Sequence, residues 1–197
     1  MKPVDKNQLL EALEDLVNSH IQTAVAEFQN MRHDELNQPA ADGGWSIAQC
    51  LEHLNRYGDY YIPMISQGLT RQRQLVKGGE FKSGLLGAYF TRMMNPDTNT
   101  GKKKLRAFKA YSPDRELDAH AVVAEFIRQQ EELLLCLRRA RMADLNKTRI
   151  PVSILKWIKL KLGDVFQFLI LHDERHVRQA RRNLTTCFSP ATPALFS

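Results

Sequence analysis

Cysteine is scarce in this chain of 197 residues, and its three copies, Cys50, Cys136 and Cys187, lie far apart. No Cys-x-x-Cys pair occurs, which argues against a cysteine-based zinc site and against the disulfide framework of small secreted domains. This cysteine usage fits a reducing compartment, and we therefore expect a cytoplasmic protein.

Long apolar runs are also absent. The first seven residues, Met-Lys-Pro-Val-Asp-Lys-Asn, contain no apolar core of a signal peptide. A membrane-spanning helix needs about 20 largely uncharged residues. The most apolar stretch, residues 154–171, is interrupted by Lys156, Lys159, Lys161 and Asp164. We therefore expect a soluble protein with no membrane partner.

The composition is ordinary for a globular protein, with 43% hydrophobic and 25% charged residues. A chain of this length can bury a sizeable core in one compact unit. We see no internal repeat or low-complexity block. The sequence predicts a single domain over residues 1–188 and a loose C-terminal tail over residues 189–197, which begins with the turn-rich stretch Ser189-Pro-Ala-Thr-Pro193.

The net charge of +6 is unevenly distributed, because residues 71–115 contain eleven Lys or Arg against three acids. Such a region is most often a solvated surface, although it could also meet phosphates, acidic substrates or an anionic surface. No recognition helix or aromatic stacking pattern accompanies it, so we do not expect nucleic-acid binding.

Apolar residues recur at helical spacing in four long segments. The pattern predicts helices over residues 5–31, 46–68, 113–143 and 162–184, and no convincing strand. The fold class is therefore all-α, a four-helix bundle with a long insertion between helices two and three. Within that insertion, residues 85–94 form a short amphipathic helix, and the insertion as a whole is expected to act as a lid or to cover a subunit contact. Residues 151–162 are expected to add a partial helical turn.

Local signals set the ends of the predicted helices. Ser46 and Gln49 form a capping box at the start of the second helix, and Gly68 is expected to close it. Pro63 weakens this helix near its end. Ser112 is expected to cap the third helix, with Pro113 at its first position.

The strongest chemical signal is the pair His172 and His176, which lie one helical turn apart on an otherwise apolar face. Such a pair alone is usually a hydrogen-bonded structural feature. A third histidine, His53, is predicted to lie on another helix of the same bundle. Three histidines could hold a divalent metal and leave positions open, as catalytic sites do. Imidazole ligands suit Zn(II), Ni(II), Fe(II) or Mn(II), of which we favour zinc or nickel.

Other polar residues are weaker candidates. His20 and Gln130 could point into the same cavity and orient a substrate, although hydrogen-bonded core groups are the more common case. Tyr57 is expected along the wall of the site, with aromatic packing as the default. Cys50 could be a fourth ligand or a reactive thiol, but a buried hydrophobic role is favoured.

Some polar residues are expected to lie away from the site. Asp173 and Glu174 lie off the ligand face and are interpreted as solvated charges. Glu52 lies about 100° around the helix from His53, so we do not expect it to bind a metal. His33 and His120 have no partner that the sequence identifies.

Two motifs resemble a known family. Trp45-Ser-Ile-Ala-Gln-Cys-Leu-Glu-His53-Leu is similar to the beginning of the second helix of DinB/YfiT-like proteins, and His172-Asp-Glu-Arg-His176-Val-Arg-Gln179 is similar to their fourth helix. The resemblance implies a four-helix bundle with His53, His172 and His176 as metal ligands, and frequent dimerisation. Relatives include transferases that use bacillithiol, mycothiol or glutathione and a thiol-dependent maleylpyruvate isomerase. The basic insertion and Pro63 have no counterpart in this pattern.

The leading hypothesis is a metal-dependent transferase or isomerase that combines a low-molecular-weight thiol with a small electrophilic substrate, with a hydrolase as the other enzyme class. We also expect a homodimer. The alternative is a stress-response bundle that binds a metal or small ligand without catalysis. These two hypotheses differ in whether metal retention is accompanied by turnover.

Overall fold

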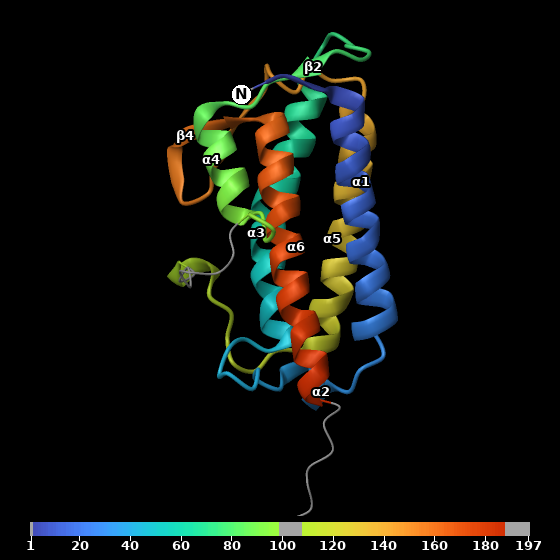
Figure 1. The fold of residues 1–197 in the computed structure, drawn as a ribbon, viewed down its shortest axis with the longest axis vertical. Coiled ribbons are helices and arrows are strands. Elements are labelled where there is room, and N and C mark those ends of the chain that lie inside the picture. Colours follow the sequence, from blue (N-terminus) through green and yellow to red (C-terminus); the bar gives the residue numbers. More distant parts are fainter. Residues whose placement is uncertain (1, 99–107, 188–197) are drawn as a thin grey trace, which may run out of the picture.

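The computed structural model describes residues 2–98 and 108–187. Two of its long helices, α1 and α3, each pack against both α5 and α6, so the predicted four-helix bundle is confirmed (Figure 1). The long helices are α1 (Lys6–Thr23, continued by the π-helical turn η1, Ala24–Phe28), α3 (Ile47–Thr70), α5 (Ala119–Ala140) and α6 (Leu162–Cys187). The short helix α2 (His33–Asn37) lies between α1 and α3 in the sequence.

The core consists of two apolar clusters, one toward each end of the bundle. The upper cluster, at the β2 end in Figure 1, includes Val17 of α1, Tyr61 of α3, Leu133 of α5 and Leu169 of α6. The lower cluster, at the α2 end, includes Phe28 of η1, Leu51 of α3, Phe126 of α5 and Val177 of α6. The sequence order of these residues shows that α3 and α5 run in the same direction, opposite to α1 and α6.

This topology explains the long connection between α3 and α5. Because the two helices are parallel neighbours, residues 71–118 must return along the whole bundle before α5 can begin. On this path lie β2 (Glu80–Phe81), α4 (Leu85–Met94) and the short 3-10 turn η2 (Lys109–Tyr111). Helix α4 packs against α6, and its outer face exposes Leu85 to 88%. Four of the basic residues of this region, Lys102, Lys103, Lys104 and Arg106, lie outside the described residues.

The start of α3 follows the sequence closely. Gln49 N–H donates to Ser46 Oγ over 3.1 Å, and Ser46 N–H donates to Gln49 Oε1 over 3.0 Å, which confirms the capping box. The expected end at Gly68 is wrong, because α3 continues through Pro63 to Thr70. Gly68 does not adopt the positive φ that would let a glycine end the helix.

The start of α5 differs from the prediction. The helix begins at Ala119, where Ala121 N–H donates to the Asp118 carboxylate, and not at Pro113. Side chains of α3 hold the preceding segment out of a helix, because Arg56 donates to the carbonyl of Ser112 and Gln49 to that of Asp114. These hydrogen bonds from α3 therefore outweigh the local preference of Ser112 and Pro113 to begin a helix.

The all-α class is confirmed, whereas the expectation that the chain forms no strands is wrong. Residues 149–161 form an antiparallel hairpin, β3 (Arg149–Val152) and β4 (Leu155–Lys161), in place of the expected helical turn. The hairpin buries its own residues Ile150, Val152 and Leu160, whereas its Trp157 is 79% exposed. Alternating buried and exposed residues with β-branched side chains favour a strand. A second pairing joins β1 (Val4–Asp5) to β2.

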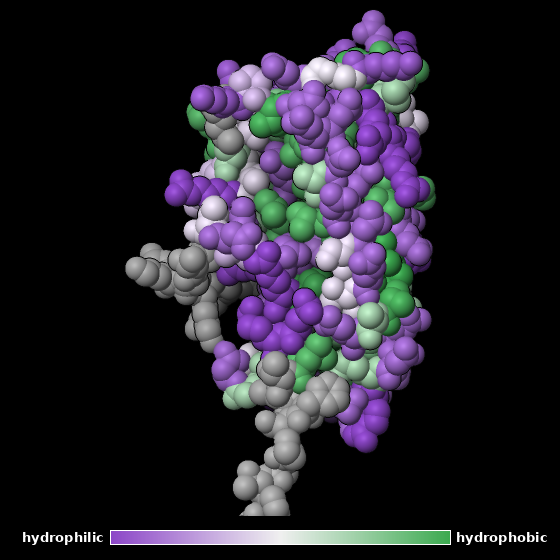
Figure 2. Space-filling view, turned by 45° about the vertical axis from the view of Figure 1, so that its right-hand side comes forward, coloured by the Kyte–Doolittle hydropathy of each residue, from purple (hydrophilic) through white to green (hydrophobic). Residues whose placement is uncertain are grey.

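The surface is mainly polar on the face shown in Figure 2, where hydrophobic side chains occur as small separate patches. This distribution is expected when each helix turns its apolar stripe inward. In the described parts of the chain, none of the helices combines the length and apolarity that crossing a membrane requires. The predicted tail, residues 189–197, lies outside the described residues.

Candidate metal centre

A layer of buried polar side chains separates the two apolar clusters. Each long helix contributes to it where its apolar stripe passes from one cluster to the other. The layer contains His20 of α1, His53 and Asn55 of α3, Gln129 and Gln130 of α5, and His172 and Asp173 of α6, each no more than 3% exposed. Buried polar groups need partners, so this level of the bundle must satisfy its own hydrogen bonds or bind something.

Three of the predicted site residues converge in this layer. His53, His172 and His176 each offer one ring nitrogen, and these three atoms all lie within 4.8 Å of one another. The Nε2 atoms of His53 and His172 approach to 3.2 Å. The ring centroids lie 4.7–5.0 Å apart, so no other side chain intervenes between the imidazoles.

The outer nitrogens of two imidazoles are fixed by acceptors. His53 Nδ1 lies 2.6 Å from the carbonyl oxygen of Tyr111, and His176 Nδ1 lies 3.0 Å from Gln179 Oε1. Because both oxygens accept, the Nδ1 atoms carry the hydrogen and the Nε2 atoms keep a lone pair. Outer partners of this kind orient metal-binding histidines.

Burial keeps the histidines neutral. It lowers the pKa of His172 well below its ordinary value and that of His176 to about 3. It also lowers the pKa of His53, although the hydrogen bond to Tyr111 opposes this shift. Neutral imidazole is the form that binds a metal.

Aromatic rings enclose the centre. Tyr57 lies 4.5 Å from His172 between ring centroids, as expected for a residue of the site wall. Trp45 stacks on His176 at 5.7 Å, and Tyr111 packs on Tyr57 at 4.2 Å. Sequence reasoning missed both of these contributions. The position of Trp45 just before the helix cap was a usable signal, whereas nothing local marks Tyr111.

His20 and Gln130 do not join the three histidines and instead build a separate network with two acids. His20 Nε2 lies 2.9 Å from Glu174 Oε2, and its Nδ1 lies 3.3 Å from Gln130 Oε1. Gln130 Nε2 donates to Asp173 over 3.1 Å. We call these four residues the acid network. Interpreting Asp173 and Glu174 as solvated charges was wrong, because Asp173 is 2% exposed and Glu174 is held against α1.

The acid network holds its two carboxyl groups in different states. Burial raises the pKa of Asp173 to about 7, whereas the hydrogen bond from His20 lowers the pKa of Glu174 to about 2. On α6 the two acids lie about 100° and 200° around the axis from His172. They therefore stabilise the contact of α6 with α1 and α5 on the side away from the histidine face.

The remaining candidates have structural roles. Cys50 is fully buried, and burial raises the pKa of its thiol to about 12, so it stays protonated and is a poor ligand. Glu52 pairs with Arg56 over 2.8 Å, as its position off the ligand face suggested. His120 lies 3.0 Å from the carbonyl of Met31 and contacts the ring of His33, partners that the sequence did not identify.

The donor set fits a divalent metal. His53 Nε2 and His176 Nε2 each keep a lone pair, and one nitrogen of each of the three rings lies within 4.8 Å of the others in this buried site. Buried lone pairs are costly unless a donor or a cation satisfies them. Three neutral imidazoles with no carboxylate or thiolate suit zinc, nickel, iron or manganese.

Comparisons with known proteins agree with this fold. A solved structure, YfiT from Bacillus subtilis, aligns over 92% of this chain and 87% of its own at 15% identity, with a TM-score of 0.53. YfiT is described as "a probable metal-dependent hydrolase with an unusual four-helix bundle topology". No curated protein matches the sequence. The sequence model of the DinB superfamily matches residues 17–180, most of the chain, and this protein therefore belongs to the DinB superfamily.

Proposed function

We propose that His53, His172 and His176 bind one divalent metal ion and that the resulting centre acts on a small molecule. The observation that carries the proposal is the convergence of three neutral imidazoles whose ring nitrogens lie within 4.8 Å of one another. Two of them have their outer N–H groups already fixed by Tyr111 and Gln179. Zinc and nickel are our favoured metals, with iron and manganese also compatible.

Three protein ligands favour catalysis over a purely structural role, because structural zinc sites use four protein ligands. A metal held in this way lowers the pKa of a thiol or water that takes an open position. The chain contributes the surrounding groups. Burial raises the pKa of Tyr57, so its phenol remains protonated and can donate a hydrogen bond to an oxygen of the substrate.

We propose a thiol transferase in preference to a hydrolase. Trp45, Tyr57 and Tyr111 surround the histidines with aromatic surface, and such surroundings favour a polarisable sulfur over water as the attacking group. In this reaction the sulfur of a low-molecular-weight thiol loses its proton and bonds to an electrophilic carbon, and the leaving group departs with its electron pair. The similarity to YfiT, described as a probable metal-dependent hydrolase, supports hydrolysis as the competing activity at the same site.

The test begins with elemental analysis of the freshly purified protein, which should contain one metal per chain. His172→Ala should abolish the metal content, and His33→Ala should leave it unchanged because His33 lies on the exposed helix α2. Protein that contains no metal and takes none up would remove the proposal. The metal-loaded protein is then assayed with glutathione, bacillithiol and mycothiol against electrophiles, and separately with ester and amide substrates.

A non-catalytic binding module is the second candidate. The observation that favours it is the deep burial of His53 and His172, each 3% exposed beneath an aromatic cover. This candidate predicts retained metal without thiol transfer or hydrolysis in the same assays. The expected homodimer stays a prediction, and sedimentation velocity of the full chain would test it.

A further inference from the structure

In the described part of the chain, one guanidinium group lies beside the three-histidine centre without an acidic partner. Arg175 follows His172 by three residues and directly precedes His176 on α6. It is half-buried, and its NH1 group donates to the carbonyl of Met93 in α4 over 3.3 Å. Within residues 2–98 and 108–187, no carboxylate forms an ion pair with it.

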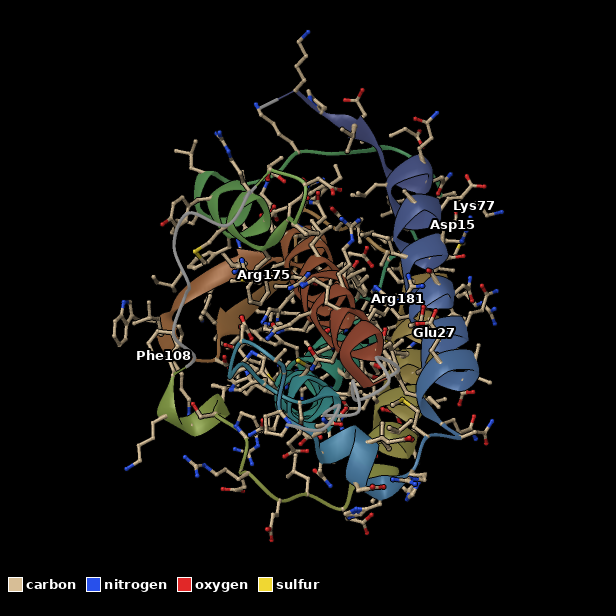
Figure 3. All side chains as sticks on the ribbon, turned by 60° about the horizontal axis from the view of Figure 1, so that its bottom comes forward. Asp15, Glu27, Lys77, Phe108, Arg175 and Arg181 are labelled. Atoms are coloured by element: carbon tan, nitrogen blue, oxygen red, sulfur yellow. The ribbon has the colours of Figure 1, made fainter. Side chains whose placement is uncertain are left out.

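Two other arginines of this part of α6 are paired with acids. Arg178 binds Glu174 and Asp97, and Arg181 binds Glu27 over 2.7 Å. Figure 3 shows Arg181 on the side of α6 that faces α1, next to Glu27, whereas Arg175 lies on the side that faces α4. Arg175 therefore differs from its neighbours in both direction and partner.

The charge of Arg175 acts on the histidines. It contributes to lowering the pKa of both His172 and His176, and burial lowers the pKa of Arg175 itself. Arg182 lies seven residues further along, about 20° away around the helix axis, and it also lowers the pKa of His176. Arg175 and Arg182 thus place two positive charges along the same side of the ligand face of α6.

This arrangement is electrostatically unfavourable around a bound cation. A divalent ion held by three neutral imidazoles brings two positive charges next to a half-buried guanidinium. An anionic group placed between them would be attracted to both. Arg175 commits only one of its donors to Met93 in the described structure, which leaves most of its five N–H groups for a ligand.

We propose that Arg175, supported by the longer-range charge of Arg182, binds a carboxylate of the small molecule that reaches the three-histidine centre. Arg175 would thereby select anionic thiols over neutral ones. The planar fork of a guanidinium matches the two oxygens of a carboxylate. This inference rests on the proposed metal site and names the substrate class for it.

The test uses the full-length chain loaded with cobalt(II), whose thiolate absorption band reports thiol binding directly. Mercaptopropionate and mercaptopropanol are titrated, since they differ in having a carboxylate or a hydroxyl. Wild-type protein should bind mercaptopropionate about 10- to 100-fold more tightly, the value of one charge-assisted hydrogen-bonded pair. Arg175→Gln should abolish this preference, and Arg175→Lys should retain part of it.

Arg181→Ala is the matched control, because it removes the same charge from the same helix on the side facing α1, and it should keep the wild-type preference. Cobalt stoichiometry shows that each variant keeps an intact centre. Equal affinity for the two thiols in the wild type would overturn the inference while the metal site stands. An unchanged preference in Arg175→Gln would also overturn it, because the carboxylate would then bind elsewhere, for example to the metal. Protein that takes up no cobalt would contradict the proposed function, and this inference with it.

Discussion

Two buried polar clusters lie at the same level of the bundle on different sides of α6. The acid network satisfies both ring nitrogens of His20 with Gln130 and Glu174. In the three-histidine centre, the outer nitrogens of His53 and His176 have acceptors, while the inner nitrogens face each other, with His53 Nε2 and His172 Nε2 3.2 Å apart. The acid network satisfies the ring nitrogens of its histidine within the protein, whereas the three-histidine centre leaves its inner nitrogens facing one another and His172 Nδ1 without a partner in the described structure.

This difference separates a structural cluster from a binding site more clearly than residue type does. Both clusters contain histidine, and both are buried. Complete hydrogen bonding stabilises the native fold, whereas ring nitrogens that face one another across a buried site, such as His53 Nε2 and His172 Nε2, favour a bound cation. We therefore expect a metal to bind at the three-histidine centre and not at the acid network.

The largest expected effect comes from removing one histidine of each cluster. His172→Ala should reduce metal affinity by orders of magnitude, because a two-histidine centre lacks a required ligand. His20→Ala should leave the metal content unchanged and lower the free energy of unfolding by about 1–3 kcal/mol, because partly buried Glu174 loses one of its two partners and keeps only Arg178. Metal analysis and urea unfolding of both variants measure the two effects.

Removing the metal with a chelator tests the same comparison. A ligand that binds only the folded state raises its stability, so a chelator should lower the melting temperature of the wild type and of His20→Ala. It should have no effect on His172→Ala. Metal loss in His20→Ala without loss of folding would show that the two clusters are one site.

A smaller effect is expected from the glutamines that support each cluster. Gln179→Ala should weaken metal binding about 10- to 100-fold, because His176 loses the acceptor that orients it. Gln130→Ala should leave metal affinity unchanged and destabilise the fold, because it removes a bridge between His20 and Asp173. Isothermal titration with zinc and urea unfolding compare the pair. Equal zinc affinities in the two variants would contradict the assignment of Gln179.

Sequence reasoning predicted the bundle because its evidence was local and repeated. The capping box of Ser46 and Gln49 and the apolar stripes each depend on residues close in the chain. The predicted start of α5 failed because Arg56 and Gln49, distant in sequence, hold residues 112–114 in place. The hairpin at 149–161 was missed because a short apolar run with scattered lysines fits either a strand or a helix.

The site was predictable only in part for the same reason. The spacing of His172 and His176 is local, and His53 follows a strong helix start, so the three could be proposed together. The acid network was not predictable, because placing Asp173 toward Gln130 requires the relative rotation of α5 and α6. Tyr111 contributes a backbone carbonyl from the far end of a long connection, and a carbonyl has no sequence signature.

The smallest expected effect is on the pH dependence of the metal-free protein, in which Asp173 partly offsets the three histidines of the centre. His176 has a pKa of about 3 when folded against an ordinary 6.5, so the unfolded chain gains the proton first and stability falls as the pH drops below about 6.5. Asp173 has a pKa of about 7 when folded against an ordinary 3.8, so its contribution to stability is largest below about 3.8 and is lost as the pH rises toward 7. His172 and His53 shift in the same direction as His176, so three histidines outweigh one aspartate, and the wild type should lose stability on acidification below about pH 6.5, where Glu174 stays ionised in both states. Urea unfolding in the presence of a chelator should show a steeper loss of stability on acidification for Asp173→Asn and a shallower one for His176→Gln. Slopes that change in the same direction in both variants would mean that the two clusters do not differ in their protonation as the structure indicates.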